Sequence, residues 1–167
     1  MKIEIDDKYF NEEELKNTPK RIKKIFEGEM DNGDFEFTTF PTNNYNEMII
    51  WKGSDVSICS HHLMPFIFNI YFAYYPNKKI CGLSKIPRLI RSICFKPQLQ
   101  EKMTVEIVNT FIKQINPQGV MCIINGKHLC CSGRGIRSDG EMITITTRGV
   151  FKTNNKLKEE FFMLAKL

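Results

Sequence analysis

Apolar residues along this chain follow two spacings, one typical of strands and one typical of helices. The aromatic and β-branched run at 66–75 ends at Pro76-Asn77, which predicts a long strand. A short strand at 79–83 is expected to complete a hairpin with it. Shorter apolar runs predict further strands at 35–40, 48–51, 120–124, 127–132 and 142–147, and the polar segment 52–55 predicts a loop.

Other segments carry the signals of helices. Apolar residues at 103, 107, 111 and 115 recur every four positions and predict a long helix over 99–115. A shorter helix is expected at 86–93, and a C-terminal helix at 156–166. Thr18 followed by Pro19 predicts the start of a helix over 18–30, because a hydroxyl cap and a proline at the first helical position both favour initiation.

The order of these elements predicts an α+β fold. Strands, then two helices, then strands again place the helices over one face of an antiparallel sheet. At 167 residues the chain has the size of one domain, expected to span 1–167 with a short extension at 1–17, the helix at 18–30 and a core at 35–167. Such a sheet has two exposed edges, which must be capped or paired with another chain.

Composition and charge narrow the class of protein. An apolar fraction of 42% supports a packed core and excludes a disordered chain, and no apolar run is long enough to span a bilayer. The N-terminal residues are acidic where a secretory signal would be apolar, so we expect a cytoplasmic protein. Six cysteines in that setting favour thiols or metal ligands over disulfides. The net charge of +5 fits nucleic acid, a small phosphorylated substrate or a merely Lys-rich surface.

Two short motifs contain all three histidines of the chain, each beside a cysteine: Cys59-Ser60-His61-His62 and His128-Leu129-Cys130-Cys131. Zinc prefers thiolate and imidazole ligands, and a catalytic zinc keeps three protein ligands and one open position. Cys59 and His62 can converge on one ion across a turn. His128 and Cys130 share one face of the predicted strand, and Cys131 would point to the other face. The pattern favours a metal centre over ordinary buried thiols and histidines, the alternative that spacing leaves open.

A second group of residues suits an anionic ligand. The segment Gly82-Leu83-Ser84-Lys85, with Arg88 close behind, lies at the predicted start of a helix, where N–H groups and cations favour phosphate. An ordinary turn with a capping serine is the alternative. Weaker candidates are Gln100 and Glu101 at the start of the long helix, Arg134 between two glycines, and Arg21 with Lys24.

Together these motifs occur in an order that resembles the GTP cyclohydrolase I family. The resemblance covers about residues 18–165 and rests on the segments 18–21, 59–62, 82–85, 97–104, 128–130 with 134–135, and 149–151. It implies a tunnelling-fold (T-fold) subunit whose sheet pairs with neighbours in a ring, two rings stacking into a homodecamer with active sites between subunits. It also implies that Cys59, His62 and Cys130 bind zinc.

The same resemblance implies a reaction and a role for each candidate residue. Family members convert GTP to formate and 7,8-dihydroneopterin triphosphate, which feeds either pterin and folate synthesis or 7-deazaguanine synthesis. His61 and His128 would move protons. Glu101 would bind the guanine edge with Gln100 beside it, and Ser84 would lie near the ribose. The triphosphate would be held by cations: Lys85, Arg88, Arg134, Arg21 and Lys24.

Several positions depart from the family pattern. Ser60 stands where relatives usually carry glutamate, Asn125 stands where they commonly carry a carboxylate, and Pro87 interrupts the phosphate segment. Losing two carboxylates beside a metal alters its hydrogen bonding and charge. Two alternatives therefore stay open: a T-fold relative that acts on another purine or pterin with altered or partial activity, and a zinc-stabilised module that binds nucleic acid.

Overall fold

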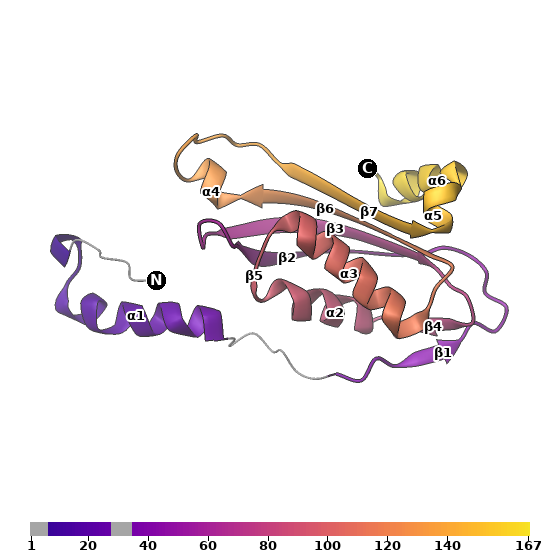
Figure 1. Ribbon diagram of the computed structural model, residues 1–167. Coiled ribbons are helices and arrows are strands. Elements are labelled where there is room, and N and C mark those ends of the chain that lie inside the picture. The colour runs from indigo at the N-terminus through magenta and orange to yellow at the C-terminus, as the bar shows by residue number, and fades with distance from the viewer. Residues whose placement is uncertain (1–6, 28–34) are drawn as a thin grey trace. The chain divides into compact units, whose positions relative to one another are not determined.

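A central strand of aromatic and β-branched residues organises the main sheet. In the computed structural model, which describes residues 7–27 and 35–167, this strand is β3 (Pro65–Tyr75). It pairs antiparallel with β2 (Ile49–Cys59) at one edge and with β6 (Gly119–His128) at the other. Two further strands complete the order β5-β2-β3-β6-β7, namely β7 (Met142–Gly149) beside β6 and β5 (Pro97–Gln98) parallel to β2 (Figure 1).

The predicted hairpin between 66–75 and 79–83 is wrong. The strand β4 (Lys79–Cys81) pairs instead with β1 (Thr39–Pro41) in a separate two-stranded sheet. Both edges of β3 are already taken by β2 and β6, so no hydrogen-bonding edge is left for β4. Of the strand expected at 35–40, only the last residues are extended into a strand, as part of β1.

Two other strand predictions also need correction. The loop expected at 52–55 lies inside β2, where Gly53 leaves room for the Trp51 ring; a Cβ at Gly53 would lie 2.3 Å from it. The strands expected at 120–124 and 127–132 are one strand, β6, which ends at His128. The next residues form a single helical turn, α4 (Leu129–Ser132).

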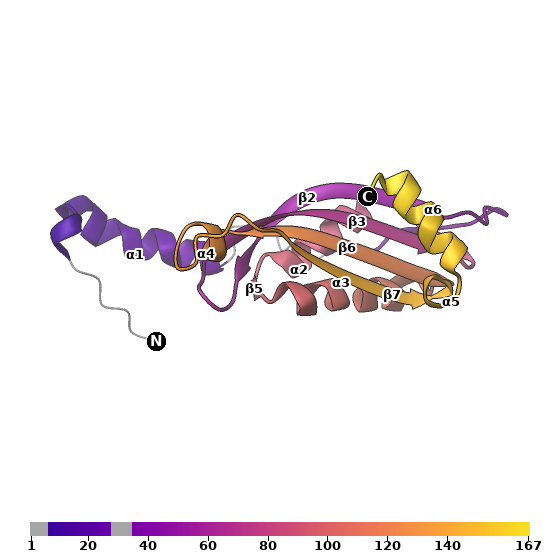
Figure 2. The same ribbon diagram turned by 90° about the horizontal axis from the view of Figure 1, so that it is seen from above.

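Helices cover both faces of the sheet to different extents. The predicted pair, α2 (Lys85–Cys94) and α3 (Gln100–Ile115), packs on one face, which confirms the α+β arrangement of an antiparallel sheet with two helices on one side. Figure 2 shows α6 (Asn155–Ala165) on the opposite face, following the short α5 (Val150–Thr153). Among the described residues, no helix is long and apolar enough to cross a membrane.

The core follows from the alternation of side chains along β3. Phe66, Phe68, Ile70 and Phe72 face α2 and α3 and are at most 1% exposed. At the centre of this layer lies Phe111 of α3, fully buried and in ring contact with three aromatic residues: Phe37, Phe72 and Tyr74. The opposite face forms a smaller core with α5 and α6. The sheet is thus fixed by burial on both sides, and most rigidly under α3.

The N-terminal residues belong to a separate compact unit, residues 1–31 against 32–167 for the rest. Its described part holds a 3-10 turn (Asp7–Tyr9) and α1 (Glu12–Glu27). The helix start predicted at Thr18 is wrong, because Asn11 and Glu14 exchange side-chain to backbone hydrogen bonds of 2.9 Å and cap the helix at Asn11, seven residues before Thr18. Pro19 therefore lies inside α1, and residues 28–30 of the predicted helix lie outside the described residues.

We expect Phe111→Ala to lower the free energy of unfolding by about 3–5 kcal/mol, because it leaves a cavity among three aromatic rings. The matched control is Phe40→Ala in β1, where the ring is 51% exposed and the loss should stay below about 1 kcal/mol. Urea unfolding at one fixed protein concentration measures both variants. Equal losses would contradict the central place of Phe111 in the core.

Candidate active site

Two strand ends converge at one end of the sheet. Since β2 and β6 both pair antiparallel with β3, they run parallel to each other and finish at the same end. The register places Ile58 of β2 opposite Pro65, and His128 of β6 opposite Phe66. Cys59 and His128 therefore flank the first residues of β3, and Cys130 follows in α4.

Cys59, His128 and Cys130 form a compact group whose ligand atoms lie within 4.8 Å of one another. Both thiols are buried. Burial, with the neighbouring Cys59 adding to it, raises the pKa of the Cys130 thiol to about 11, so this thiol is neutral at pH 7 unless a cation stabilises its thiolate. Two sulfurs and an imidazole are a donor set that suits zinc, which displaces the thiol protons on binding. The residues at this position therefore fit a metal ion.

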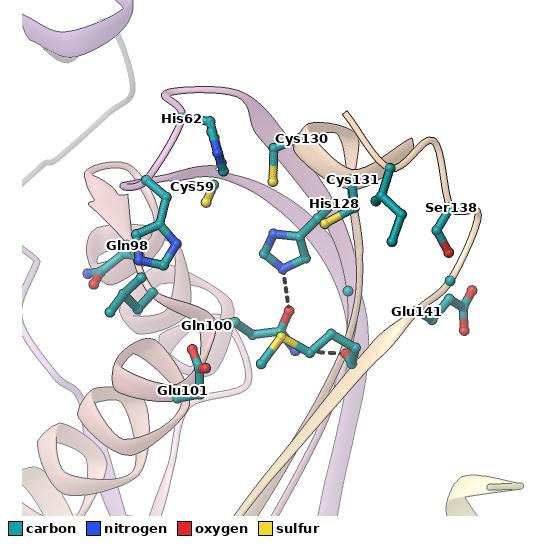
Figure 3. A pocket seen from close by; sticks show the side chains of 16 residues that line it. Cys59, His62, Gln98, Gln100, Glu101, His128, Cys130, Cys131, Ser138 and Glu141 are labelled. Carbon is teal, nitrogen blue, oxygen red and sulfur yellow. Dashed lines mark hydrogen bonds between the residues drawn. The ribbon is translucent and has the colours of Figure 1, made fainter. Parts of the chain in front are cut away.

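A cavity of about 430 Å³ opens beside the thiols. Figure 3 shows Cys59, Cys130 and His128 at one side of it and Glu101 at another. Its walls come from the turn after β2, the first turn of α3, the end of β6 and the loop before β7. A space of this size suits a ligand of nucleoside dimensions.

The turn after β2 brings the two remaining histidines to this cavity. His61 and His62 are exposed, line the cavity, and have ring centroids 6.2 Å apart in an edge-to-face arrangement. His62, the predicted third metal ligand, lies outside the tightest group, in which His128 takes that place. The structure thus brings Cys59 and Cys130 together and offers two imidazoles beside them.

His128 is held on two sides. Its ring stacks on Phe66 with centroids 4.3 Å apart and planes 5° from parallel. Its Nε2 lies 2.9 Å from Oε1 of Gln100, which is buried at the start of α3. Burial lowers the pKa of His128, although the charge of Glu101 acts in the opposite direction. The imidazole is therefore neutral at pH 7 and able to accept a proton.

Glu101, the carboxylate predicted from the sequence, lies at this cavity. It is exposed in the first turn of α3, adjacent in sequence to Gln100, and lines the cavity. An exposed carboxylate facing a cavity can accept hydrogen bonds from N–H groups of a ligand. The described residues that line the cavity include no Lys or Arg.

Comparison with known proteins shows the family of this chain. A family model described as GTP cyclohydrolase I matches residues 3–166. The chain belongs to the GTP cyclohydrolase I family.

Relatives named GTP cyclohydrolase 1 cover most of the chain. The relative from Hydrogenobaculum sp. (strain Y04AAS1) is 45% identical over 91% of this chain and 85% of its own length. The relative from Aquifex aeolicus (strain VF5) is 41% identical over 92% of this chain and 85% of its own length. Among solved structures, the archaeosine synthase QueF-Like in the apo form has a TM-score of 0.49 at 15% identity, covering 59% of this chain and 92% of that one, a likeness too weak to carry an argument.

In this member of the GTP cyclohydrolase I family, the predicted phosphate and ribose ligands at the start of α2 do not line the cavity. Ser84, Lys85 and Arg88 are absent from its lining. They lie at the start of α2, whose last residue, Cys94, accepts a hydrogen bond from Ser57 of β2 near the cavity. Ten helical residues separate the two ends by about 15 Å. The ammonium group of Lys85 instead lies 5.9 Å from the centroid of the Phe35 ring.

The other predicted phosphate ligands lie outside the cavity lining as well. Arg134 is exposed on the loop between α4 and β7, whose later residues, among them Ile136, do line the cavity. Arg21 and Lys24 belong to α1 in the N-terminal unit. There Arg21 forms an ion pair with Glu13 at 2.5 Å.

Cys131 lines the same cavity, contrary to its predicted position on the opposite face of a strand. The reason is that the chain turns into α4 after His128, so the alternation of strand side chains no longer applies. Sequence reasoning also gave no role to Phe66 or Thr144, which contact His128 and Gln100. Phe66 and Thr144 are identified only by the register of the strands, which cannot be read from the sequence.

The two positions where the family usually carries a carboxylate have different surroundings. Asn125 donates from Nδ2 to a carboxylate oxygen of Glu141 at 2.6 Å, so the loop before β7 supplies a negative charge beside it. The Oδ1 of Asn125 is buried and has no hydrogen-bond partner among the described residues. Ser60 is exposed, and its backbone N–H donates to the carbonyl of Gln98.

Proposed function

We propose that the protein is a zinc-dependent GTP cyclohydrolase I, which opens the imidazole ring of the guanine of GTP and releases formate. The product would be 7,8-dihydroneopterin triphosphate. The observation that carries this proposal is the convergence of Cys59, Cys130 and histidine side chains at the mouth of a nucleoside-sized cavity. Family membership and the curated relatives named GTP cyclohydrolase 1 support the choice of substrate.

Zinc would be held by Cys59, Cys130 and His62. His62 makes no hydrogen bond among the described residues and lies on the exposed turn next to Cys59, so turning toward an ion would cost it only its edge-to-face contact with His61. His128 is the competing third ligand, because its nitrogen is already near both thiols. When bound, zinc lowers the pKa of a water molecule toward neutrality and so supplies a nucleophile for hydrolysis.

Proton transfer falls to the remaining histidines. His128 is neutral at pH 7 because burial lowers its pKa, so it accepts a proton from the attacking water and returns one to the ring nitrogen that leaves. His61, exposed at the other side of the cavity, can deliver a second proton. Phe66 and Gln100 hold the His128 ring in place during both transfers.

Glu101 would select guanine. Guanine presents N–H donors at N1 and N2, whereas adenine presents an acceptor at N1, and an ionised carboxylate can only accept. A site built to accept hydrogen bonds rejects a ligand that lacks the matching donors. Gln100 lies beside Glu101 but turns its amide into the protein, toward β6 and β7.

The triphosphate would be bound by a second copy of the chain. The described residues of the cavity lining include no Lys or Arg, while Ser84, Lys85 and Arg88 lie about one α2 length away, at the opposite end of the same helix. A neighbour that presents this end to the cavity would supply the missing cations and the serine near the ribose. Arg134, on the loop that borders the cavity, is placed to join them, and Arg21 and Lys24 are further candidates. This arrangement favours a ring-shaped homo-oligomer, for which we propose two stacked pentamers.

We expect zinc-loaded protein to convert GTP to formate and a fluorescent pterin product. Cys130→Ala should abolish turnover, because it removes one of the two sulfurs at the metal. Cys81→Ala, which changes a half-buried cysteine remote from the cavity lining, should retain it. Formate release and pterin fluorescence measure both variants.

Absence of GTP turnover in zinc-loaded wild type would contradict the proposal. Intact turnover in Glu101→Ala would instead indicate that guanine is not the base this site selects, as expected for a relative that acts on another purine or pterin. A zinc-stabilised nucleic-acid module is disfavoured by a cavity without cations, since such modules need Lys or Arg against phosphates.

We expect two inactive variants to restore activity when they share an oligomer. Cys130→Ala disables the metal end and Arg88→Ala the phosphate end, so a hybrid site between one subunit of each kind keeps both ends intact. Equal co-expression should give about a quarter of wild-type activity if the two ends come from neighbouring subunits. Co-expression of Cys59→Ala with Cys130→Ala is the matched control and should stay inactive. A hybrid with no more activity than its parents would place both ends in one subunit.

A further inference from the structure

We propose that Gln100 is a positioning residue that holds neutral His128 in its Nε2–H form, leaving the lone pair of Nδ1 directed at the thiol side of the cavity. The tautomer follows from hydrogen bonds alone. Its catalytic consequence rests on the proposed function.

The orientation of the Gln100 amide is fixed by its surroundings. The Nε2 of this buried side chain lies 3.1 Å from the carbonyl oxygen of Ile124 and 2.8 Å from that of Met142. Carbonyl oxygens only accept hydrogen bonds, so the NH₂ end of the amide must face them. A flipped amide would set its own oxygen against two carbonyl oxygens in a buried site, which is strongly unfavourable.

A pair of threonines agrees with this orientation. Thr104 Oγ1 donates to the backbone carbonyl of Gln100 at 2.7 Å, which uses its one hydrogen. In its 2.7 Å contact with Thr144 Oγ1, Thr104 must therefore accept, and Thr144 donates. Thr144 then has a lone pair for the Gln100 Nε2 at 3.1 Å. The two protons of the Gln100 Nε2 serve three acceptors, the two carbonyls and Thr144, so one contact is shared, and all three contacts agree on the direction of the amide.

With the NH₂ end fixed, Oε1 of Gln100 is the atom that faces His128. An amide oxygen accepts only, so the 2.9 Å contact requires His128 Nε2 to carry the proton. A 180° flip of the ring would keep its stacking on Phe66 but would set the carbon Cε1 against the Gln100 oxygen, so the hydrogen bond favours the observed orientation. In a neutral imidazole the other nitrogen is then unprotonated.

The free nitrogen faces the reactive side. Figure 3 shows the second ring nitrogen of His128 on the side of the ring turned toward Cys59 and Cys130. The close approach of these three ligand groups, within 4.8 Å, agrees with that view. Nδ1 is thus the ring nitrogen turned toward the thiol side of the cavity, while Nε2–H remains bonded to Gln100.

Gly126 makes this arrangement possible. It lies on β6 between Ile124 and His128, on the face toward α3, and a Cβ there would come within 2.3 Å of Gln100 Oε1. The Gln100 oxygen that accepts the hydrogen bond from His128 therefore occupies the space that a side chain at position 126 would fill. Gln100 acts through His128, and it is distinct in this respect from Glu101, which faces the ligand.

The direct test is the ¹⁵N spectrum of zinc-loaded protein labelled at its three histidines, recorded by magic-angle-spinning NMR and assigned by the signals that are lost in His128→Gln. We expect a protonated Nε2 and an unprotonated Nδ1 for His128. Gln100→Leu should lose this pattern. Thr104→Val, the matched control, removes a neighbouring hydrogen bond without touching His128 and should retain the pattern.

Turnover of GTP adds a second readout. We expect Gln100→Leu to lower kcat by about 100-fold with little change in KM, and Thr104→Val to stay close to wild type. A wild-type spectrum with the proton on Nδ1, or an unchanged spectrum in Gln100→Leu, would overturn the inference. The expected tautomer in a protein that fails to convert GTP would support the inference and overturn the proposed function.

Discussion

The pairing of β3 with a strand on each of its edges is the constraint on which the rest of this structure depends. Because β2 and β6 both run antiparallel to β3, their C-terminal ends must meet at its first residues. Cys59 ends β2, His128 ends β6, and Cys130 follows two residues later in α4. A one-residue slip of either register would turn the whole set of side chains to the opposite face and separate the two motifs. The aromatic core under α3, with Phe111 at its centre, makes such a slip costly.

A buried polar network then orders the chemistry at this end. Gln100 connects α3 to β6 and β7 through carbonyl and hydroxyl acceptors and supports His128 with the one oxygen that remains. Buried amides of this kind are unfavourable unless every group is paired, and here each contact also fixes a direction. The same residues that hold the helix to the sheet therefore decide which nitrogen of His128 is available for reaction.

Much of the fold and part of the site could be predicted from the sequence. The aromatic run of β3 and the four-residue repeat of α3 are local signals, and both elements lie close to where they were expected. The Cys-x-x-His and His-x-Cys motifs pointed to a metal centre because zinc prefers thiolate and imidazole ligands, and Cys59, His128 and Cys130 do lie together in the structure. The resemblance to GTP cyclohydrolase I, carried by motif order, is confirmed by the family match.

What the sequence could not provide is set by contacts between distant residues. The partner of β4 depended on which edges of β3 were already occupied. The turn of the chain into α4 after His128 decided that Cys131 lines the cavity, and strand alternation predicted the reverse. The described residues of the cavity lining include no Lys or Arg, which is likewise a property of tertiary structure, and our proposal that a second copy of the chain binds the triphosphate rests on it.

The central claim is that Cys59 and Cys130 bind zinc together with one histidine at the shared end of β2 and β6. The most direct test is X-ray absorption at the zinc edge, together with measurement of the zinc content of the His62→Ala and His128→Ala variants. The account predicts two sulfur ligands at about 2.3 Å and nitrogen or oxygen ligands at about 2.0–2.1 Å, with zinc lost mainly from His62→Ala. Zinc without sulfur ligands would contradict the centre itself, and zinc lost only from His128→Ala would assign the third ligand to His128.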